Sequence, residues 1–287
     1  MSQRVDFSAN AANYDRRHGS VLPEETARSL AAAATLGSND SILDIGAGTG
    51  RVASAFLGLG YPVVAVEPAV SMAEAFRTKT VALPTRVVRG EGERLPFRSS
   101  IVDAVVIARL LYLAVDWPTI LREAHRVLKP GGRLLHEWGN GHAAEAWAQI
   151  REKARALFED AGIVAPFHPG ARSEEQIDQH LTTLGFVTRS KVVVGPGPSL
   201  TLRDFLNRIV SGEFSYIWAV PTDVQEACLP ALRAWSEATF DLEQLVPMPE
   251  QLEWTIFQKD AVQQAFAAGS GQRDNEPAAA ETRSLAR

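Results

Sequence analysis

The sequence predicts an α/β protein organised around a doubly wound, mostly parallel sheet. Residues 41–51 (SILDIGAGTGR) change from an apolar run to closely spaced glycines, and a helical pattern follows. A second apolar run at 63–66 is continuous, as in strands buried on both faces. Runs of this kind alternate with helical patterns as far as residue 138. Strands and helices in such alternation form a parallel sheet with helices on its faces.

The glycine turn is the most informative stretch. An apolar strand over residues 42–45 ends in Gly46, Gly48 and Gly50, and a helix is expected over residues 52–57. Glycine adopts positive φ angles and lets backbone N–H groups approach a ligand at the positive end of the helix dipole. The turn therefore predicts a nucleotide-like ligand, and a glycine turn without a ligand is the alternative.

The remaining elements of the first half follow from their start and stop signals. Pro23 begins a helix that Gly37 closes. Asp116 and Pro118 suit the cap and first turn of a later helix, which the segment 129–132 (KPGG) ends. The other elements expected here are a helix over 72–79 and strands over 86–89, 101–108 and 133–138.

Beyond residue 138 the pattern loosens into helices and two more strands. Ser173 and Thr201 are expected to cap two of the helices, and Pro230 to kink or divide a third. The tail from Gly269 lacks apolar residues to bury and is predicted to be disordered. The expected elements are helices over 147–161, 173–184, 201–209 and 222–240, and strands over 186–194 and 253–258.

The composition argues against several classes of protein. A net charge of −5 without a dense Lys/Arg block disfavours a nucleic-acid or anionic-membrane binder. Cys228 is the only cysteine, so neither an intrachain disulfide nor a cysteine metal cluster is expected, and the histidine spacing gives no metal-site pattern. No apolar run has the length of a signal peptide or a bilayer span, which favours a cytoplasmic protein. Monomer and homodimer both remain open.

The spacing of the turn indicates which nucleotide it suits. A dinucleotide fingerprint needs Gly-x-Gly-x-x-Gly, and Arg51 stands at its third glycine position. Asp44 followed by the three alternating glycines instead resembles motif I of the class I S-adenosylmethionine-dependent methyltransferases. Residues 90–92 (GEG) and 95–97 (LPF) are similar to that family's Gly-Asp-Ala and Leu-Pro-Phe segment, with glutamate and glycine replacing the aspartate and alanine.

Further segments extend the resemblance. Residues 102–106 (VDAVV) and 126–132 (RVLKPGG) are similar to the family's fourth strand and the entry to its fifth. Tyr14 and Asp15 resemble part of the amino-terminal helix that folds over the cofactor in many members. The chain thus looks like a small-molecule member with a methyltransferase-11-like domain. This resemblance implies a Rossmann-like, seven-stranded sheet of order 3-2-1-4-5-7-6, with the last strand antiparallel and a helical lid inserted.

The same resemblance divides the chain into four parts. Residues 1–40 are expected to supply helices that cover the cofactor, and residues 41–140 the S-adenosylmethionine-binding α/β core. Residues 141–268 are expected to hold the remaining strands with the helical substrate lid, and residues 269–287 the disordered tail.

Cofactor-binding residues are expected at the carboxyl ends of the strands, where ligands of open α/β sheets lie. Glu67 closes the second strand, where a carboxylate accepts both hydroxyls of a ribose, and a solvated strand-end glutamate is the alternative. The resemblance implies that Glu91 accepts the adenine amino group. Asp44 either orients the cofactor's ammonium group or caps the glycine loop. The full expected set is Tyr14, Asp44, Gly46, Ala47, Gly48, Gly50, Glu67, Pro68, Met72, Glu91, Gly92, Ala108 and Arg109.

Acceptor-side residues are expected where the sequence leaves the family pattern. Arg109 either clamps an acceptor carboxylate or pairs with an acid of its own chain. Tyr112 hydrogen-bonds the acceptor or packs as a half-buried aromatic, and His136 is the preferred general base against a structural role. Four aromatic residues either cover an apolar acceptor or form the core of the added helices, namely Phe205, Phe214, Tyr216 and Trp218.

The predicted activity is methyl transfer from S-adenosylmethionine to a small apolar or aromatic molecule. In-line displacement at a sulfonium carbon needs alignment and exclusion of water, and a base only when the nucleophile sheds a proton. The motifs therefore predict the cofactor and leave open whether oxygen, nitrogen, sulfur or carbon accepts the methyl. An NAD-dependent oxidoreductase and a non-catalytic S-adenosylmethionine-binding protein are the alternatives.

Overall fold

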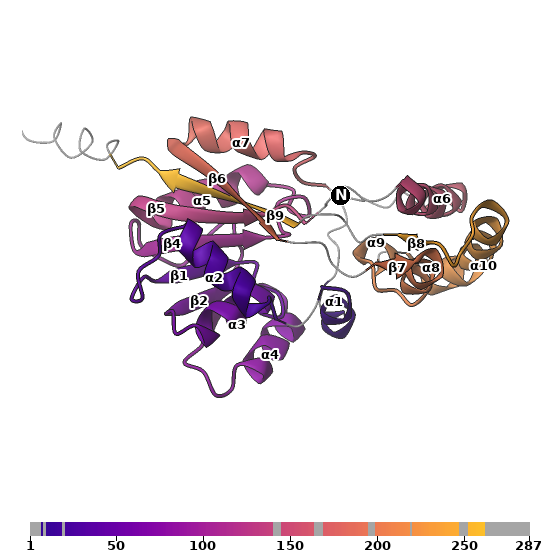
Figure 1. The fold of residues 1–287 in the computed structure, drawn as a ribbon, viewed down its shortest axis with the longest axis horizontal. Helices are drawn as coiled ribbons and strands as arrows, with labels where there is room; N and C mark the ends of the chain where they lie inside the picture. The colour runs from indigo at the N-terminus through magenta and orange to yellow at the C-terminus, as the bar shows by residue number, and fades with distance from the viewer. Residues whose placement is uncertain are drawn as a thin grey trace, which may run out of the picture.

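The protein is a three-layer α/β structure with an added helical unit. The computed structural model describes residues 7, 10–18, 21–139, 145–163, 169–194, 199–218, 220–246 and 252–261. Its central sheet has the strand order β3-β2-β1-β4-β5-β9-β6 (Figure 1). This confirms the predicted fold class and strand order, because β9 is the seventh strand of the sheet along the chain. The predicted disordered tail lies outside the described residues.

The sheet is parallel except at one strand. β9 pairs antiparallel with β5 on one side and with β6 on the other, as the resemblance implied. β1, β2, β3, β4 and β5 pair in parallel, so their carboxyl ends meet at one edge. The strands are β1 (Ile42–Ile45), β2 (Val63–Val66), β3 (Arg86–Val88), β4 (Val102–Ala108), β5 (Leu128–Glu137), β6 (Phe186–Val194) and β9 (Leu252–Lys259).

Helices cover both faces of the sheet because successive strand residues point to opposite sides. Ile42 packs in the core beneath α2, α3 and α4, whereas its neighbour Leu43 packs in the core beneath α5 and α7. Both residues are buried. The helices are α2 (Glu24–Ala33), α3 (Arg51–Gly58), α4 (Val70–Lys79), α5 (Trp117–Val127) and α7 (Glu174–Thr183).

Several helix ends differ in detail from the expectation. Asp116 caps α5 by accepting the Thr119 N–H, and the helix ends at Val127. The KPGG segment was expected to end the helix ahead of a strand over 133–138. It instead lies within β5, which begins directly after the helix at Leu128. The side chain of Ser173 caps α7, as predicted.

A second unit consists mainly of helices and has its own core. It contains α6 (Glu145–Asp160), α8 (Leu202–Val210), α9 (Ser215–Trp218), α10 (Thr222–Thr239) and the ribbon β7 (Leu200–Thr201) with β8 (Leu245–Val246). The predicted capping box of α8 is present, and α10 continues through Pro230 without division. The rings of Trp147 and Phe205 stack 4.4 Å apart inside this core. Phe214 and Tyr216 are also buried there, so packing within the unit accounts for three of the four predicted lid aromatics.

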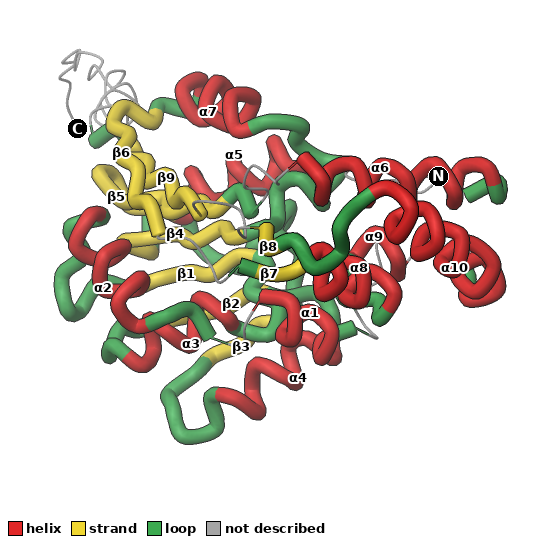
Figure 2. The backbone as a smooth tube through the Cα atoms, turned by 45° about the vertical axis from the view of Figure 1, so that its right-hand side comes forward, coloured by secondary structure: helices red, strands yellow, loops and turns green. Residues whose placement is uncertain are grey.

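The helix α1 (Ala11–His18) lies between the sheet and the helical unit, beside α4 (Figures 1 and 2). The ring of Phe7, which precedes α1, contacts Trp218 of α9 edge-to-face at 5.3 Å. The helices within the described ranges are all too short or too polar to traverse a lipid bilayer.

Candidate functional site

A cavity of about 180 Å³ opens at the carboxyl edge of the sheet. Its wall is formed by α1, the glycine turn after β1, the end of β2, the loop after β3 and the segment after β4. Five predicted residues do not line it, namely Asp44, Ala47, Gly50, Tyr112 and His136. The predicted residues that do line it are Tyr14, Gly46, Gly48, Glu67, Pro68, Met72, Glu91, Gly92, Ala108 and Arg109.

The glycine turn has a conformation that side chains disfavour. Gly46, Gly48 and Gly50 have φ angles of 69°, 57° and 81°. A Cβ atom on Gly50 would lie 2.1 Å from the Phe76 ring, so this glycine serves close packing of α3 against α4. A Cβ atom on Gly48 would meet its nearest atom, in Tyr14, only at 3.9 Å. The backbone of Gly48 therefore faces open space in the cavity.

Glu67 fixes the shape of the wall next to this turn. Its side chain is buried, with Oε2 accepting the Gly48 N–H at 2.8 Å and Oε1 accepting the Ala69 N–H at 2.9 Å. Burial raises the pKa of the carboxyl, and the two backbone hydrogen bonds oppose that shift. Each carboxylate oxygen has a second lone pair, so a pre-oriented acceptor remains in the cavity wall.

Asp44 lies beneath the turn as a buried carboxyl that is 2% exposed. Burial raises its pKa to about 7, against the opposing effects of the Ala53 N–H and the Arg51 guanidinium. Ala53 lies in the first turn of α3, directly after the glycine turn, so this contact favours the capping alternative for Asp44. The other oxygen, Oδ2, has no hydrogen-bond partner among the described residues. An unpaired buried acceptor of this kind is costly and suits a cationic ligand group.

A buried ion triad stands at the β4–β5 side of the cavity. Glu137, the last residue of β5, pairs through Oε2 with Arg51 and through Oε1 with Arg109 Nε at 3.0 Å. All three side chains are less than one-tenth exposed. The two guanidinium groups hold the pKa of Glu137 below its usual range although burial opposes this. The in-chain pairing of Arg109, one of the two alternatives from the sequence, is therefore present.

The helix α1 is fastened across the glycine turn by Asp15. Its carboxylate accepts a hydrogen bond from the Thr49 hydroxyl and forms an ion pair with Lys79 Nζ at 2.7 Å. The adjacent Tyr14 lines the cavity, and burial of its hydroxyl raises the pKa to about 12. Tyr14 therefore remains a neutral hydrogen-bonding group at physiological pH.

The loop after β3 approaches the sheet closely. Glu91 is exposed at the rim, and Gly92 and Glu93 are partly buried in the wall. A Cβ atom on Gly92 would lie 3.0 Å from Ile45 and 3.3 Å from Ile120. The glycine that replaces the family's alanine at this position thus allows a tight approach of the loop to β1 and α5.

The two predicted acceptor-side residues, Tyr112 and His136, both have rings next to the ring of Trp138. The ring of Tyr112 contacts Trp138 at 5.7 Å, and that of His136 lies 6.4 Å from it. His136 is 1% exposed, and burial lowers its pKa to about 4. Its Nε2 has no hydrogen-bond partner among the described residues. The strand instead directs Glu137 to Arg109 of the cavity wall, and the alternation of side chains along β5 is the signal that separates Glu137 from His136.

Comparison with known proteins gives a consistent set of matches. Residues 43–136 match the model of a methyltransferase domain. The uncharacterized methyltransferase Rv3342 from Mycobacterium tuberculosis is 30% identical over 204 residues, which cover 67% of this chain and 79% of that relative. A demethylmenaquinone methyltransferase from Streptomyces griseus is 33% identical over 132 residues, or 45% of this chain and 56% of that relative.

A solved structure extends the likeness of the fold beyond the core. Phospholethanolamine N-methyltransferase 2 from Haemonchus contortus, in complex with phosphomonomethylethanolamine and S-adenosylhomocysteine, superposes with a TM-score of 0.53 at 15% identity. The match covers 88% of this chain and 57% of that chain. At this level of identity it supports the shared fold.

Proposed function

The chain belongs to the class I S-adenosylmethionine-dependent methyltransferases, and from that premise we propose that it transfers a methyl group from S-adenosylmethionine to a small-molecule acceptor. The observation that carries the proposal is the cavity at the carboxyl edge of the sheet. Its wall combines the half-buried backbone of Gly48 with the carboxylate of Glu67, which the Gly48 N–H holds in place. Such an edge is where open α/β sheets bind ligands.

The residues of the cavity suit the parts of S-adenosylmethionine. In this proposal Glu67 holds the ribose hydroxyls, and Glu91 and Gly92 meet the adenine base. In this proposal Asp44, which lies beneath the cavity wall rather than in it, orients the ammonium group, and its unpaired Oδ2 would gain a partner. When bound, the cofactor supplies an electrophilic methyl group, and the protein has to align an acceptor with it and exclude water. The remaining proposed contacts in the wall are Tyr14, Gly46, Gly48, Pro68, Met72, Ala108 and Arg109. Ala47 and Gly50 belong to the same turn but do not line the cavity, and their contacts stay predictions.

A small apolar or aromatic acceptor is the second part of the proposal. The cavity is walled partly by the apolar side chains of Phe7, Leu110 and Leu113. The ring pair of Tyr112 and Trp138 packs outside this wall. The Streptomyces griseus relative is a demethylmenaquinone methyltransferase, and a quinone acceptor for that relative supports this class of molecule. The acidic net charge and the single cysteine favour a cytoplasmic enzyme without a nucleic-acid substrate.

Titration calorimetry and a methyl-release assay test the proposal. We expect S-adenosylhomocysteine to bind and NAD not to bind, because Arg51 occupies the position of the third dinucleotide glycine. Binding of NAD in place of the adenosyl ligand would contradict it. Methyl release to a panel of quinones and phenols then separates an enzyme from a protein that only binds the cofactor.

The roles of His136 and Tyr112 stay predictions. At neutral pH His136 is uncharged, the state that a general base requires, although its low pKa makes it a weak one. His136→Asn should reduce turnover and leave S-adenosylhomocysteine affinity unchanged, because the residue lies outside the cavity wall. Normal turnover in this variant would end the proposal of a base at position 136.

A further inference from the structure

The loop that follows β3 is held from behind by one face of α5. We define residues 91–97 as the base loop, since its first three residues line the cavity. Ile120, Glu123 and Arg126 lie three residues apart along α5, a spacing that places them on one face of the helix. Ile120 lines the cavity beside Gly92, and the other two lie outside the cavity wall. The same helix face therefore forms the wall and supports the loop.

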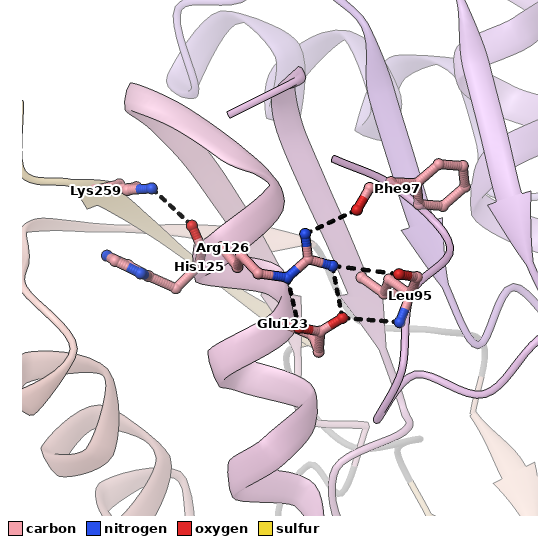
Figure 3. Close-up of polar contacts among 6 residues, drawn as sticks. All are labelled: Leu95, Phe97, Glu123, His125, Arg126 and Lys259. Carbon is pink, nitrogen blue, oxygen red and sulfur yellow. Dashed lines mark hydrogen bonds and ion pairs between the residues drawn. The ribbon is translucent and has the colours of Figure 1, made fainter. Parts of the chain in front are cut away.

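The side chains of Arg126 and Glu123 hydrogen-bond the backbone of the base loop, as Figure 3 shows. Arg126 donates through Nη1 to the Phe97 carbonyl at 2.7 Å and through Nη2 to the Leu95 carbonyl at 3.2 Å. Glu123 accepts the Leu95 N–H at 2.8 Å and pairs with Arg126 at 2.6 and 2.7 Å. These contacts fix three backbone groups of the loop, whatever side chains the loop carries.

We call Glu123 and Arg126, with their contacts to the base loop, the clamp. Its ion pair is stable over the physiological pH range. The negative charge of Glu123 balances the positive charge of Arg126. Their mutual hydrogen bonds lower the pKa of Glu123 and raise that of Arg126, so both groups stay ionised. Both side chains are partly exposed, at 34% and 18%, so the geometry of the contacts matters more than the Coulomb energy.

The helix end that carries Arg126 is itself anchored to the last strand. Lys259 of β9 is 3% exposed and donates to the carbonyls of His125 at 2.7 Å and Leu128 at 2.8 Å. Figure 3 shows the lysine approaching the end of α5 from the side opposite the base loop. The clamp therefore joins a rigid part of the sheet to the loop.

We infer that Arg126 and Glu123 are positioning residues that set the affinity of the cavity for the adenosine half of its ligand without touching that ligand. The inference rests on the proposed function for the identity of the ligand. The loop supplies wall residues only near its start, so a loosened loop should weaken contacts to the base and leave the opposite end of the cavity intact. Preorganised walls of this kind increase affinity by reducing the ordering that binding requires.

Calorimetry with two ligands tests where the effect falls. We expect Arg126→Met to lose about tenfold in affinity for S-adenosylhomocysteine and the same factor for 5′-methylthioadenosine, which has the adenosine but lacks the amino-acid end. Arg122→Met is the matched control, because Arg122 is exposed on the same helix and donates to Thr119 rather than to the loop. Unchanged affinity in Arg126→Met, or a loss confined to S-adenosylhomocysteine, would overturn the inference.

Hydrogen exchange of the ligand-free protein provides a second readout that does not depend on the cofactor. In Arg126→Met we expect faster exchange at the amides of residues 91–95 and unchanged exchange in the sheet. The milder Glu123→Gln should speed exchange of the Leu95 amide in particular, since that N–H loses its charged acceptor. Exchange that rises equally throughout the sheet, or not at all in the loop, would reject a positioning role.

The two readouts separate this inference from the proposed function. If the wild-type protein binds neither adenosyl ligand, the proposed function fails, and the exchange experiment still decides whether the clamp holds the loop. If the wild-type protein binds both ligands while Arg126→Met matches it in affinity, the clamp fails and the proposed function stands.

Discussion

The two sides of the cavity are built in different ways. On the β2–β3 side Glu67 directly follows β2, and Glu91 and Glu93 lie in the loop after β3. Backbone N–H groups hold Glu67, the buried one of the three. On the β4–β5 side Arg109 is held by Glu137, which lies twenty-eight residues farther along the chain. The first side is thus a local structure, and the second depends on the assembled sheet.

The difference determines how each side responds to substitution. Glu67, the buried acid of the β2–β3 side, is partly satisfied by backbone N–H groups, so its loss should affect a ligand more than the fold. The arginines of the β4–β5 side are buried and share one carboxylate, so loss of that carboxylate should affect the fold first. Each substitution below tests this contrast, beginning with the largest expected effect.

Glu137→Gln should be the most destabilising change. It leaves the buried guanidinium groups of Arg51 and Arg109 without their shared negative charge, which typically costs about 3–5 kcal/mol of unfolding free energy. Urea denaturation measures the loss. Glu243→Gln is the control, because Glu243 pairs with Arg203 on the surface, where solvent screening leaves a much smaller effect. Equal effects of the two substitutions would remove the contrast between the two sides.

Asp44→Asn should stabilise the protein at high pH. Folded Asp44 keeps its proton up to about pH 7, whereas an unfolded aspartate loses it at about pH 4. Between these values the folded state binds more protons, so the free energy of unfolding falls as the pH rises through this window. The variant should exceed wild type by about 2–4 kcal/mol at pH 8 and by less at pH 5, as urea denaturation at both values measures. A difference that does not change with pH would mean that Asp44 is ionised throughout.

The sequence predicted the local side of the cavity better than the assembled side. The glycines form the turn of a strand–turn–helix unit and Glu67 ends the next strand, so their positions in the fold follow from a few adjacent residues. Glu137 could not be chosen over His136 in this way, because their neighbouring positions differ only in which face of β5 they take. The pairing of Arg51 with Glu137 joins the turn after β1 to the end of β5, and it exists only once β4 lies between them.

In the helical unit, too, the sequence predicts contacts between adjacent residues better than contacts between distant ones. The caps of α7 and α8 could be predicted because each involves a side chain and a backbone group three residues apart. Whether Phe205 covers a ligand or fills a core depends on its neighbours in space. The structure supplies such a neighbour in Trp147, which stacks on it from a helix more than fifty residues earlier.

Glu67→Ala should weaken binding of the adenosyl ligand more than it weakens the fold. Loss of the charged acceptor and of the bond to Gly48 should reduce the binding free energy by about 1–3 kcal/mol. Calorimetry with S-adenosylhomocysteine measures the change, and Glu74→Ala, an exposed position on α4, is the control. Unaltered affinity would remove Glu67 from the proposed site and leave it a purely structural residue of the turn.

Asp15→Ala should have the smallest effect, and it tests the helix that crosses the glycine turn. The substitution removes the Lys79 ion pair and the Thr49 hydrogen bond, which are partly exposed and together contribute about 1 kcal/mol. Because these contacts hold α1 rather than the sheet, we expect faster amide exchange within α1 and an unchanged free energy of global unfolding. Lys79→Met should reproduce part of the effect, since it removes one of the two contacts. If either variant instead lowers the free energy of global unfolding without changing amide exchange in α1, the helix unfolds together with the core and not as a separate unit.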